Sequence, residues 1–484
     1  MQQNRGGVQK QFKLFGLFKL LFLLLSIASL NASSFEDFKR TQSSQFSDYK
    51  DKRDAEFENY LTSSWEEYTA KATKDFYEKP KPKSIAPTVE RKIRDLGPRV
   101  NIKLPKITPQ KKPIVVKTLV KKDFMFNFFG QELAFDIDEN IKEVKFYPQN
   151  QVGIASAFKV FASSDYEDTV RELNTICKTL HLNDWALYLL VKQLANEMYS
   201  NSDESALFTW FMLNKLGYDV KVGLSKHHIV LLHYSKKVIY ATPSYSFSEK
   251  HYYRISQYSK TSKDRVYTYP QSYPGVDKAL DLALKELPLF VEDLRKRELH
   301  FKQFNKEYTV SYKYNQNLIN FMQTYPQADY ETFFNAPLTD SIYQEIAKDL
   351  KKYINTMQSS SAINFVLNFV QKAFIYERDG EQFGREKVMF AYETLYYDKS
   401  DCEDRAILFA SLVKKLFGIS VVGVKYKDHM AIALYIPMKG DSVMNNGKRF
   451  VIADPTYINA NIGQSMPKYR SKIPESFIVV KSRG

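Results

Sequence analysis

The chain has 484 residues, more than one hydrophobic core usually holds, so two or more domains are expected. Its composition, 44% hydrophobic with 35 Phe and 33 Tyr, excludes a disordered chain. The net charge is +15, but residues 1–33 hold +4 of it and residues 79–122 hold +12. Because the remainder is close to neutral, the sequence indicates no nucleic-acid partner.

Residues 1–32 have the composition of an export signal. Basic residues precede an apolar run from Leu20 to Ala28, and small residues surround Ala32. This order is typical of a cleaved signal peptide, and an uncleaved signal anchor is the alternative. We therefore expect an exported protein that is periplasmic or membrane-anchored by its N-terminus on the outer side of the inner membrane.

Residues 34–78 carry aromatic residues at a spacing of eleven. The two registers are Phe35, Phe46, Phe57 and Tyr68, and Phe38, Tyr49 and Tyr60. An eleven-residue repeat keeps a stripe on one helical face, so the segment is predicted to be an amphipathic aromatic helix. Its stripe would cover the protein's own surface, a second copy of the chain, or an envelope protein partner that binds residues 35–68.

Residues 79–117 are rich in Lys and Pro and lack helical periodicity. Such a composition predicts a semi-rigid, extended linker exposed to solvent.

Beyond the linker the sequence repeats itself. Phe128 to Phe135 aligns with Gln303 to Val310, and a later set of three matches consists of Leu207 with Leu408, Gly217 with Gly418, and His228 with His429. Each copy is predicted to hold a β-hairpin, helices and then paired strands, which is an α+β unit. We assign residues 118–250 to the first copy, 298–484 to the second, and 251–297 to a connector with a helix from Val276 to Arg297.

The second copy contains a pattern that suits nucleophilic catalysis. Cys402 lies at a predicted helix start, where Ser400 and Glu403 form a capping box and the helix dipole favours the thiolate. His429 follows in a strand pair and is the candidate base. Asp454 ends the next strand, where its carboxylate would orient the imidazole.

These residues resemble the transglutaminase-like superfamily in Asp401-Cys-Glu-Asp404, Asp428-His429 and Asp454-Pro-Thr-Tyr457, within residues 362–469. The resemblance implies a papain-like α+β fold in each of two tandem units, with helices packed on an antiparallel sheet. It also implies a hydrolase or acyltransferase that cleaves or exchanges peptide, amide or isopeptide bonds of a polypeptide substrate through a Cys402 thioester, without a cofactor. The alternative is a non-catalytic envelope binding or scaffold protein with this fold.

The first copy is predicted to be degenerate, because Asn201 stands opposite Cys402, His228 opposite His429, and Thr242 opposite Asp454. The second copy carries an additional segment within residues 375–399 and a further insertion between His429 and Asp454. Insertions confined to one copy suggest substrate loops. The resemblance makes Gln382 a candidate oxyanion or substrate residue, with a solvated loop residue as its alternative.

The remaining candidates carry no chemistry. Cys177 lies in a helical pattern and is predicted to be a small buried apolar residue. His227 and His228 are adjacent, and no ligand spacing surrounds them, so no metal site is predicted.

Overall fold

The computed structural model describes residues 37, 41, 50–63, 65–71, 81–104, 122–255 and 265–481. The chain separates into two compact units, residues 1–63 and residues 64–484. The predicted signal segment 1–32 lies outside the described residues, as do most of residues 34–49, residues 72–80 and residues 105–121.

The predicted aromatic helix is shorter than the sequence pattern suggested. Residues 50–61 are helical, and the rings of Phe57 and Tyr60 stack with centroids 6.2 Å apart. In the second unit, however, Glu66–Thr69 forms strand β1, and the Tyr68 ring packs against Phe247 at 4.6 Å. One helix over 34–78 is therefore wrong, because Tyr68 is used as a strand residue at a sheet edge.

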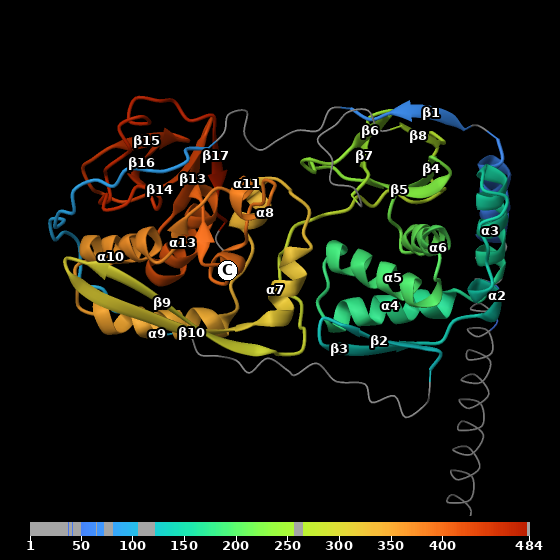
Figure 1. The fold of residues 1–484 in the computed structure, drawn as a ribbon, viewed down its shortest axis with the longest axis horizontal. Helices are drawn as coiled ribbons and strands as arrows, with labels where there is room; N and C mark the ends of the chain where they lie inside the picture. The colour runs from blue at the N-terminus through green and yellow to red at the C-terminus, as the bar shows by residue number, and fades with distance from the viewer. Residues whose placement is uncertain are drawn as a thin grey trace, which may run out of the picture. The chain divides into compact units, whose positions relative to one another are not determined.

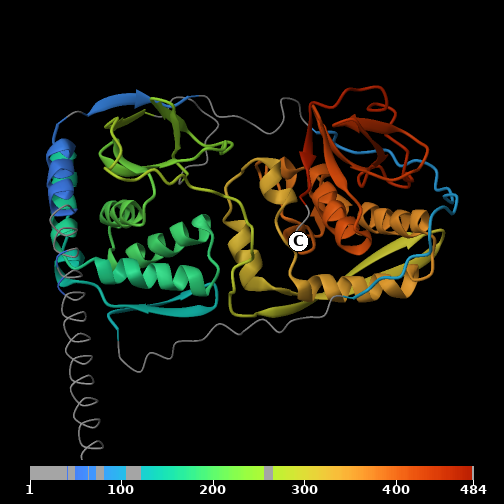
Figure 2. The same ribbon diagram turned by 180° about the vertical axis from the view of Figure 1, so that it is seen from behind.

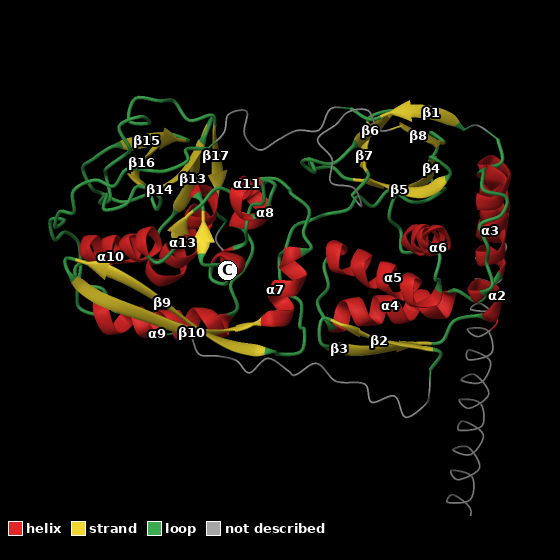
Figure 3. Cartoon of the chain, viewed as in Figure 1, coloured by secondary structure: helices red, strands yellow, loops and turns green. Residues whose placement is uncertain are grey.

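Two antiparallel sheets in residues 64–484 have the same strand order (Figures 1 and 3). The first runs β8-β4-β5-β7-β6, with β1 paired to β8, and its strands are β4 Val220–Ser225, β5 His228–Tyr234, β6 Ser244–Phe247, β7 Lys250–Tyr253 and β8 Arg265–Thr268. The second runs β17-β13-β14-β16-β15, with β13 Val421–Tyr426, β14 His429–Leu434, β15 Ser442–Asn445, β16 Lys448–Ala453 and β17 Ser476–Val479. The fold is thus mixed α+β, and one strand arrangement occurs twice.

The helices and the preceding hairpins also occur in the same order. The hairpin β2 Phe124–Phe128 with β3 Gln131–Phe135 corresponds to β9 Leu294–Gln303 with β10 Lys306–Asn315. Their turns match closely: φ is 47° at Phe129 and 84° at Gly130, against 48° at Phe304 and 60° at Asn305. Two successive positive φ angles are typical of a type I′ turn. Both predicted hairpins are therefore confirmed.

Further helices complete each copy. The first copy has α2 Glu139–Lys142, α3 Gln151–Ser163, α4 Glu167–Thr179, α5 Asp184–Met198 and α6 Ser202–Lys215. The second has α7 Gln316–Gln323, α8 Tyr330–Phe334, α9 Asp340–Ile354, α10 Ser359–Lys372, α11 Asp379–Gln382, α12 Ala391–Thr394 and α13 Cys402–Phe417, with the short parallel strands β11 Ile375–Tyr376 and β12 Lys399–Ser400. Helix α6 contacts β4 and β5, and α13 contacts β13 and β14, so each sheet receives the last helix of its copy.

The connector differs from its prediction. Residues 276–293 contain no helix, and β9 begins at Leu294. Leu280, Leu282 and Leu284 are buried while the residues between them are less covered, which is the period of an extended chain. Moreover, β8 and most of β7 lie within residues 251–297 and complete the first sheet, so the connector is partly a piece of the first copy.

Residues 81–104, here called the strap, are extended and mostly exposed, as predicted, but they are also bonded to another part of the chain. They wrap the second copy in an irregular path (Figure 2). The strap bonds to the start of α10 through Ser359 N–H to Pro98 O at 2.9 Å and Ser360 N–H to Leu96 O at 3.1 Å. Farther along, Ile102 is buried. The composition did not indicate this attachment, because Pro and Lys residues give no signal for backbone hydrogen bonds to a distant part of the chain.

Candidate active site

Cys402 is placed at the N-terminus of a helix, as predicted. Helix α13 begins at Cys402, its N-cap is Asp401, and it ends before Gly418 in the left-handed conformation with φ 65°. The predicted capping box of Ser400 with Glu403 is shifted by one residue, because the Asp401 N–H donates to Asp404 Oδ2 at 3.3 Å. Cys402 therefore occupies the first helical position.

His429 and Asp454 meet as the sequence predicted. His429 begins β14, and β16 pairs with β14 through Ile432 and Ala453, the residue before Asp454. The His429 Nε2 atom lies 2.9 Å from Asp454 Oδ2, and both side chains are buried. The second carboxylate oxygen, Asp454 Oδ1, accepts the backbone N–H groups of Thr456 and Tyr457 at 3.0 and 3.2 Å. The carboxylate is thus fixed from both sides, and it fixes the imidazole.

The other ring nitrogen, His429 Nδ1, is buried and has no hydrogen-bond partner in the described part of the chain. A buried polar atom without a partner is rare, and such atoms concentrate at functional sites. A base held through Nε2 with Nδ1 uncommitted is ready to exchange a proton at Nδ1.

Tyr469 is a site residue that the sequence analysis missed. Its ring stacks on His429 with centroids 4.7 Å apart and an angle of 19°, and its hydroxyl donates to Asp428 Oδ1 at 3.0 Å. Burial, then Asp428, and further Cys402 and Asp454 raise the pKa of the Tyr469 phenol. Cys402 and Asp454 therefore both lie within electrostatic range of the ring that covers His429. No sequence signal pointed to Tyr469, because it follows β16 in an irregular segment.

The electrostatic setting of Cys402 differs from the prediction. The thiol is fully buried, and its Sγ donates to Glu403 Oε2 at 3.2 Å. Burial, followed by the Glu403 and Asp401 carboxylates, raises the pKa of Cys402 well above its usual value. The expectation that the helix dipole favours the thiolate is therefore wrong for this state, because nearby negative charge and the loss of solvent outweigh the helix N-terminus.

Four carboxylates beside Cys402 form what we call the acidic cluster: Asp379, Glu386, Asp401 and Glu403. The ammonium of Lys81, from the strap, lies among them at 3.2 Å from Asp379, 2.9 Å from Glu386 and 2.5 Å from Asp401, and it also pairs with Glu403. Asp379, Asp401 and Glu403 are fully buried, and the Lys81 side chain is 1% exposed.

The pKa values of the carboxyl groups in the acidic cluster are shifted in different directions. Burial raises the pKa of Asp379 to about 7 and the pKa of Asp401 well above its usual value. Burial opposes ionisation of Glu403 as well, but Lys81 holds the pKa of Glu403 below its usual value. One ammonium cannot neutralise every carboxylate, so Lys81 favours the ionised form of Glu403, while burial favours the protonated forms of Asp379 and Asp401.

No metal site is predicted from the sequence, and the acidic cluster was not predicted either. Three groups of side chains in the described part of the chain have ligand atoms within 4.8 Å of one another and could hold a cation: Asp379 with Glu386 and Glu403, Asp401 with Cys402 and Glu403, and Asp379 with Asp401 and Asp404. Their oxygens suit a hard divalent ion, but the positive charge placed among them is the Lys81 ammonium.

The additional segment at 375–399 builds much of this site. It contains α11, α12 and the short strands β11 and β12, and it supplies Asp379 and Glu386. Gln382, the candidate oxyanion residue, instead places its Nε2 3.5 Å from Lys399 O, within the same segment. The structure therefore links the segment to the site through its acids and gives Gln382 a local contact.

In the first copy, Asn201 is the N-cap of α6 and its side chain accepts the Asp203 N–H. His228 begins β5 but its side chain is 75% exposed, with Nδ1 at 3.2 Å from Asp203 Oδ2. His228 therefore begins its strand as the repeat predicted, whereas Asn201, as an N-cap, corresponds to Asp401 and lies one position before the place of Cys402.

The pairing of Thr242 with Asp454 is wrong, however. β16 corresponds by strand order to β7, and Thr242 precedes β6 in a loop. The hairpin β6–β7 is the counterpart of β15–β16, so the expected insertion between His429 and Asp454 is absent. The misalignment arose because the intervening strands share no residue pattern.

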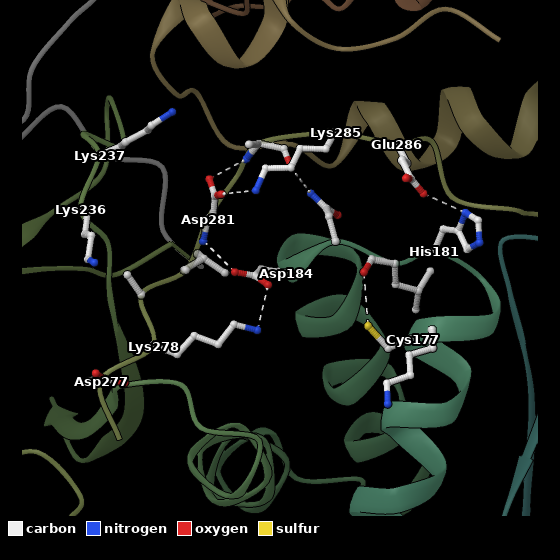
Figure 4. A pocket seen from close by; sticks show the side chains of 16 residues that line it. Cys177, His181, Asp184, Lys236, Lys237, Asp277, Lys278, Asp281, Lys285 and Glu286 are labelled. Atoms are coloured by element: carbon white, nitrogen blue, oxygen red, sulfur yellow. Dashed lines mark hydrogen bonds and ion pairs between the residues drawn. The ribbon is translucent and has the colours of Figure 1, made fainter. Parts of the chain in front are cut away.

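Cys177 lies away from this chemistry. It is partly buried, and its Sγ donates to Leu182 O at 3.2 Å. Burial raises the pKa of Cys177. The residue lines an open pocket together with residues of both charges, among them His181, Asp184 and Lys278 (Figure 4). The mixed charge of this lining does not select a ligand class.

No protein-family model, curated protein or solved structure matches this chain significantly. Within the described ranges, none of the helices has the length and apolar character needed to span a bilayer.

Proposed function

We propose that the chain is a transglutaminase-like cysteine hydrolase or acyltransferase, built from two tandem papain-like units of which the second is active. The observation that carries this proposal is the buried His429–Asp454 pair with an uncommitted Nδ1, in the copy that has a cysteine at the first position of its last helix. Such a set of groups is the one that thiol acyl transfer requires.

In the proposed reaction His429 takes the proton of Cys402 and the sulfur attacks the carbonyl carbon of a peptide, amide or isopeptide bond. The C–N bond breaks, His429 returns the proton to the departing amine, and a Cys402 thioester remains. Water resolves the thioester in hydrolysis, and a second amine resolves it in transfer. Asp454 and Tyr469 act as positioning residues for the imidazole.

An ester of a good leaving group tests this proposal without knowledge of the substrate. In a Cys177→Ala background, p-nitrophenyl acetate should acetylate Cys402, detected by intact mass and peptide mapping, with release of nitrophenolate. His429→Asn should slow acetylation strongly, while His228→Asn should not. Equal acetylation of the His429→Asn and parent proteins would contradict catalysis.

The second candidate is the non-catalytic envelope binding or scaffold protein, and the full burial and raised pKa of Cys402 favour it. In that case the polar groups at α13 serve only to stabilise the copy. If deletion of the gene gives a cellular phenotype, and a gene that encodes the Cys402→Ala variant fully reverses it, this candidate is supported.

Export remains part of the proposal and rests on the composition of residues 1–32. Partner binding through residues 35–68 also remains a proposal, now centred on the helical residues 50–61. N-terminal sequencing of the protein from soluble and membrane envelope fractions would test export and distinguish a cleaved signal from an anchor.

A further inference from the structure

The strap reaches the active-site region by a continuous series of contacts. Its Thr88 N–H donates to Ile458 O at 3.0 Å, and Asn459 Nδ2 donates to Thr88 O at 2.9 Å, in the segment that follows Asp454. Nearer its start, Pro82 O accepts the Tyr376 hydroxyl at 2.9 Å. These contacts deliver the side chain of Lys81 into the acidic cluster.

Lys81 and the thiol share one carboxylate. Glu403 pairs with the Lys81 ammonium through Oε1 and accepts the Cys402 thiol through Oε2. Burial by itself lowers the pKa of Lys81, but Asp401, Glu403 and Asp379 raise it well above its usual value. The site therefore holds an ammonium group tightly, directly beside the proposed nucleophile.

Two carboxylate oxygens of the acidic cluster remain able to accept a hydrogen bond. Asp379 Oδ1 and Asp401 Oδ1 are buried and lack a hydrogen-bond partner in the described part of the chain. A purely structural lysine pair would be expected to satisfy its acceptors.

We infer that the acidic cluster is a subsite for a primary ammonium group of the substrate, and that Lys81 is its resident intramolecular occupant. The substrate class is then a polypeptide or peptide-like molecule with a free primary amine next to the bond that Cys402 attacks. This inference rests on the proposed function. The strap covers the subsite, and the substrate ammonium takes its place when the strap leaves.

Charged thiol reagents test this subsite in the full chain with Cys177 replaced by Ala. Aminoethyl methanethiosulfonate carries an ammonium group, and methyl methanethiosulfonate is neutral. In both reactions the Cys402 thiolate attacks the sulfenyl sulfur, a disulfide forms and methanesulfinate leaves. After correction for reactivity toward a small free thiol, Lys81→Ala should favour the cationic reagent by on the order of tenfold, because the carboxylates then lack their cation.

The matched control is Lys83→Ala, an exposed lysine of the same strap, which should leave both rates at the parent values. Equal rates of the two reagents with Lys81→Ala would overturn the inference. So would protection of this variant by a divalent cation but not by n-propylammonium. Disulfide formation needs no turnover, so this test is independent of the acetylation test. If Lys81→Ala prefers the cationic reagent but His429→Asn acetylates as fast as the parent, the subsite is supported and the proposed function is rejected.

A variant that does not fold also gives an answer. Lys81→Ala lacks the three outer methylenes and the ammonium, which n-propylammonium supplies. Circular dichroism measures whether the fold recovers. Recovery with n-propylammonium but not with 1-propanol supports the subsite. Equal recovery by both, or by neither, overturns it.

Discussion

Helix α6 of the first copy begins beside Asp203, which holds the exposed ring of His228, whereas helix α13 of the second begins with Cys402, and the sheet of that copy carries the buried pair of His429 and Asp454. Both sheets have the same strand order, so the difference does not come from the framework. It comes from the residues at three element ends and from the segment 375–399. The shared strand order therefore forms with either set of residues, because sheet and helix packing do not depend on these polar groups.

The largest expected effect separates the two histidines. His429→Asn should lower the rate of Cys402 acylation by on the order of 10³-fold, because a base oriented by Asp454 is lost. His228→Asn should change it by less than about twofold, since an exposed ring bonded only to Asp203 has no proton to exchange with Cys402. Nitrophenolate release measures both, and equal losses would remove the distinction between the copies.

The next effect contrasts two buried lysines. Lys81→Met should lower the free energy of unfolding by ~3 kcal/mol, because the Glu403 carboxylate stays buried without its cation. Lys221, on β4, lies over the rings of Phe247, Tyr252 and Tyr269, and burial lowers its pKa to about 7. Lys221→Met should therefore change stability by less than about 1 kcal/mol. Urea unfolding at pH 7 measures both variants, and similar losses would show that Lys81 is not a special ion partner.

A third effect isolates the stacking residue. Tyr469→Leu should slow acylation about tenfold, because the imidazole loses the ring that restricts it, while Tyr469→Phe should slow it less than about threefold. The pH at which the acylation rate is half-maximal should differ from that of the parent in the Leu variant and equal that of the parent in the Phe variant. If the Tyr469→Leu variant is less stable than the parent but acylates at the same rate, the ring has a packing role alone.

The sequence predicted those features that have a local signal. The hairpins, the helix start at Cys402 and the meeting of His429 with Asp454 follow from turn residues, strand alternation and the order of elements. Lys81 could not be found, because 320 residues separate it from Asp401 and its segment has the composition of a linker. Thr242 was misplaced for a related reason: an ungapped alignment cannot show which strand pairs with β5. The prediction of a helix at 276–297 was wrong because its leucines are spaced by two residues, which is the period of an extended chain, and because Pro288 disfavours a helix interior.

The smallest expected effect concerns Asp379, which has no counterpart in the first copy. Its pKa in the folded state is raised by burial to about 7, above that of the unfolded chain, so the folded state binds a proton more tightly. The stability that this proton adds is fully present below about pH 4 and is lost as the pH rises through about 7. Asp379→Asn carries no such proton, so its unfolding free energy should fall less, by about 1 kcal/mol, than that of the parent between pH 6 and 7. Urea titrations across this range measure the difference. A parallel pH dependence in the two proteins would mean that Asp379 is ionised throughout, and that Lys81 then balances a larger negative charge beside Cys402 than the folded site is expected to hold.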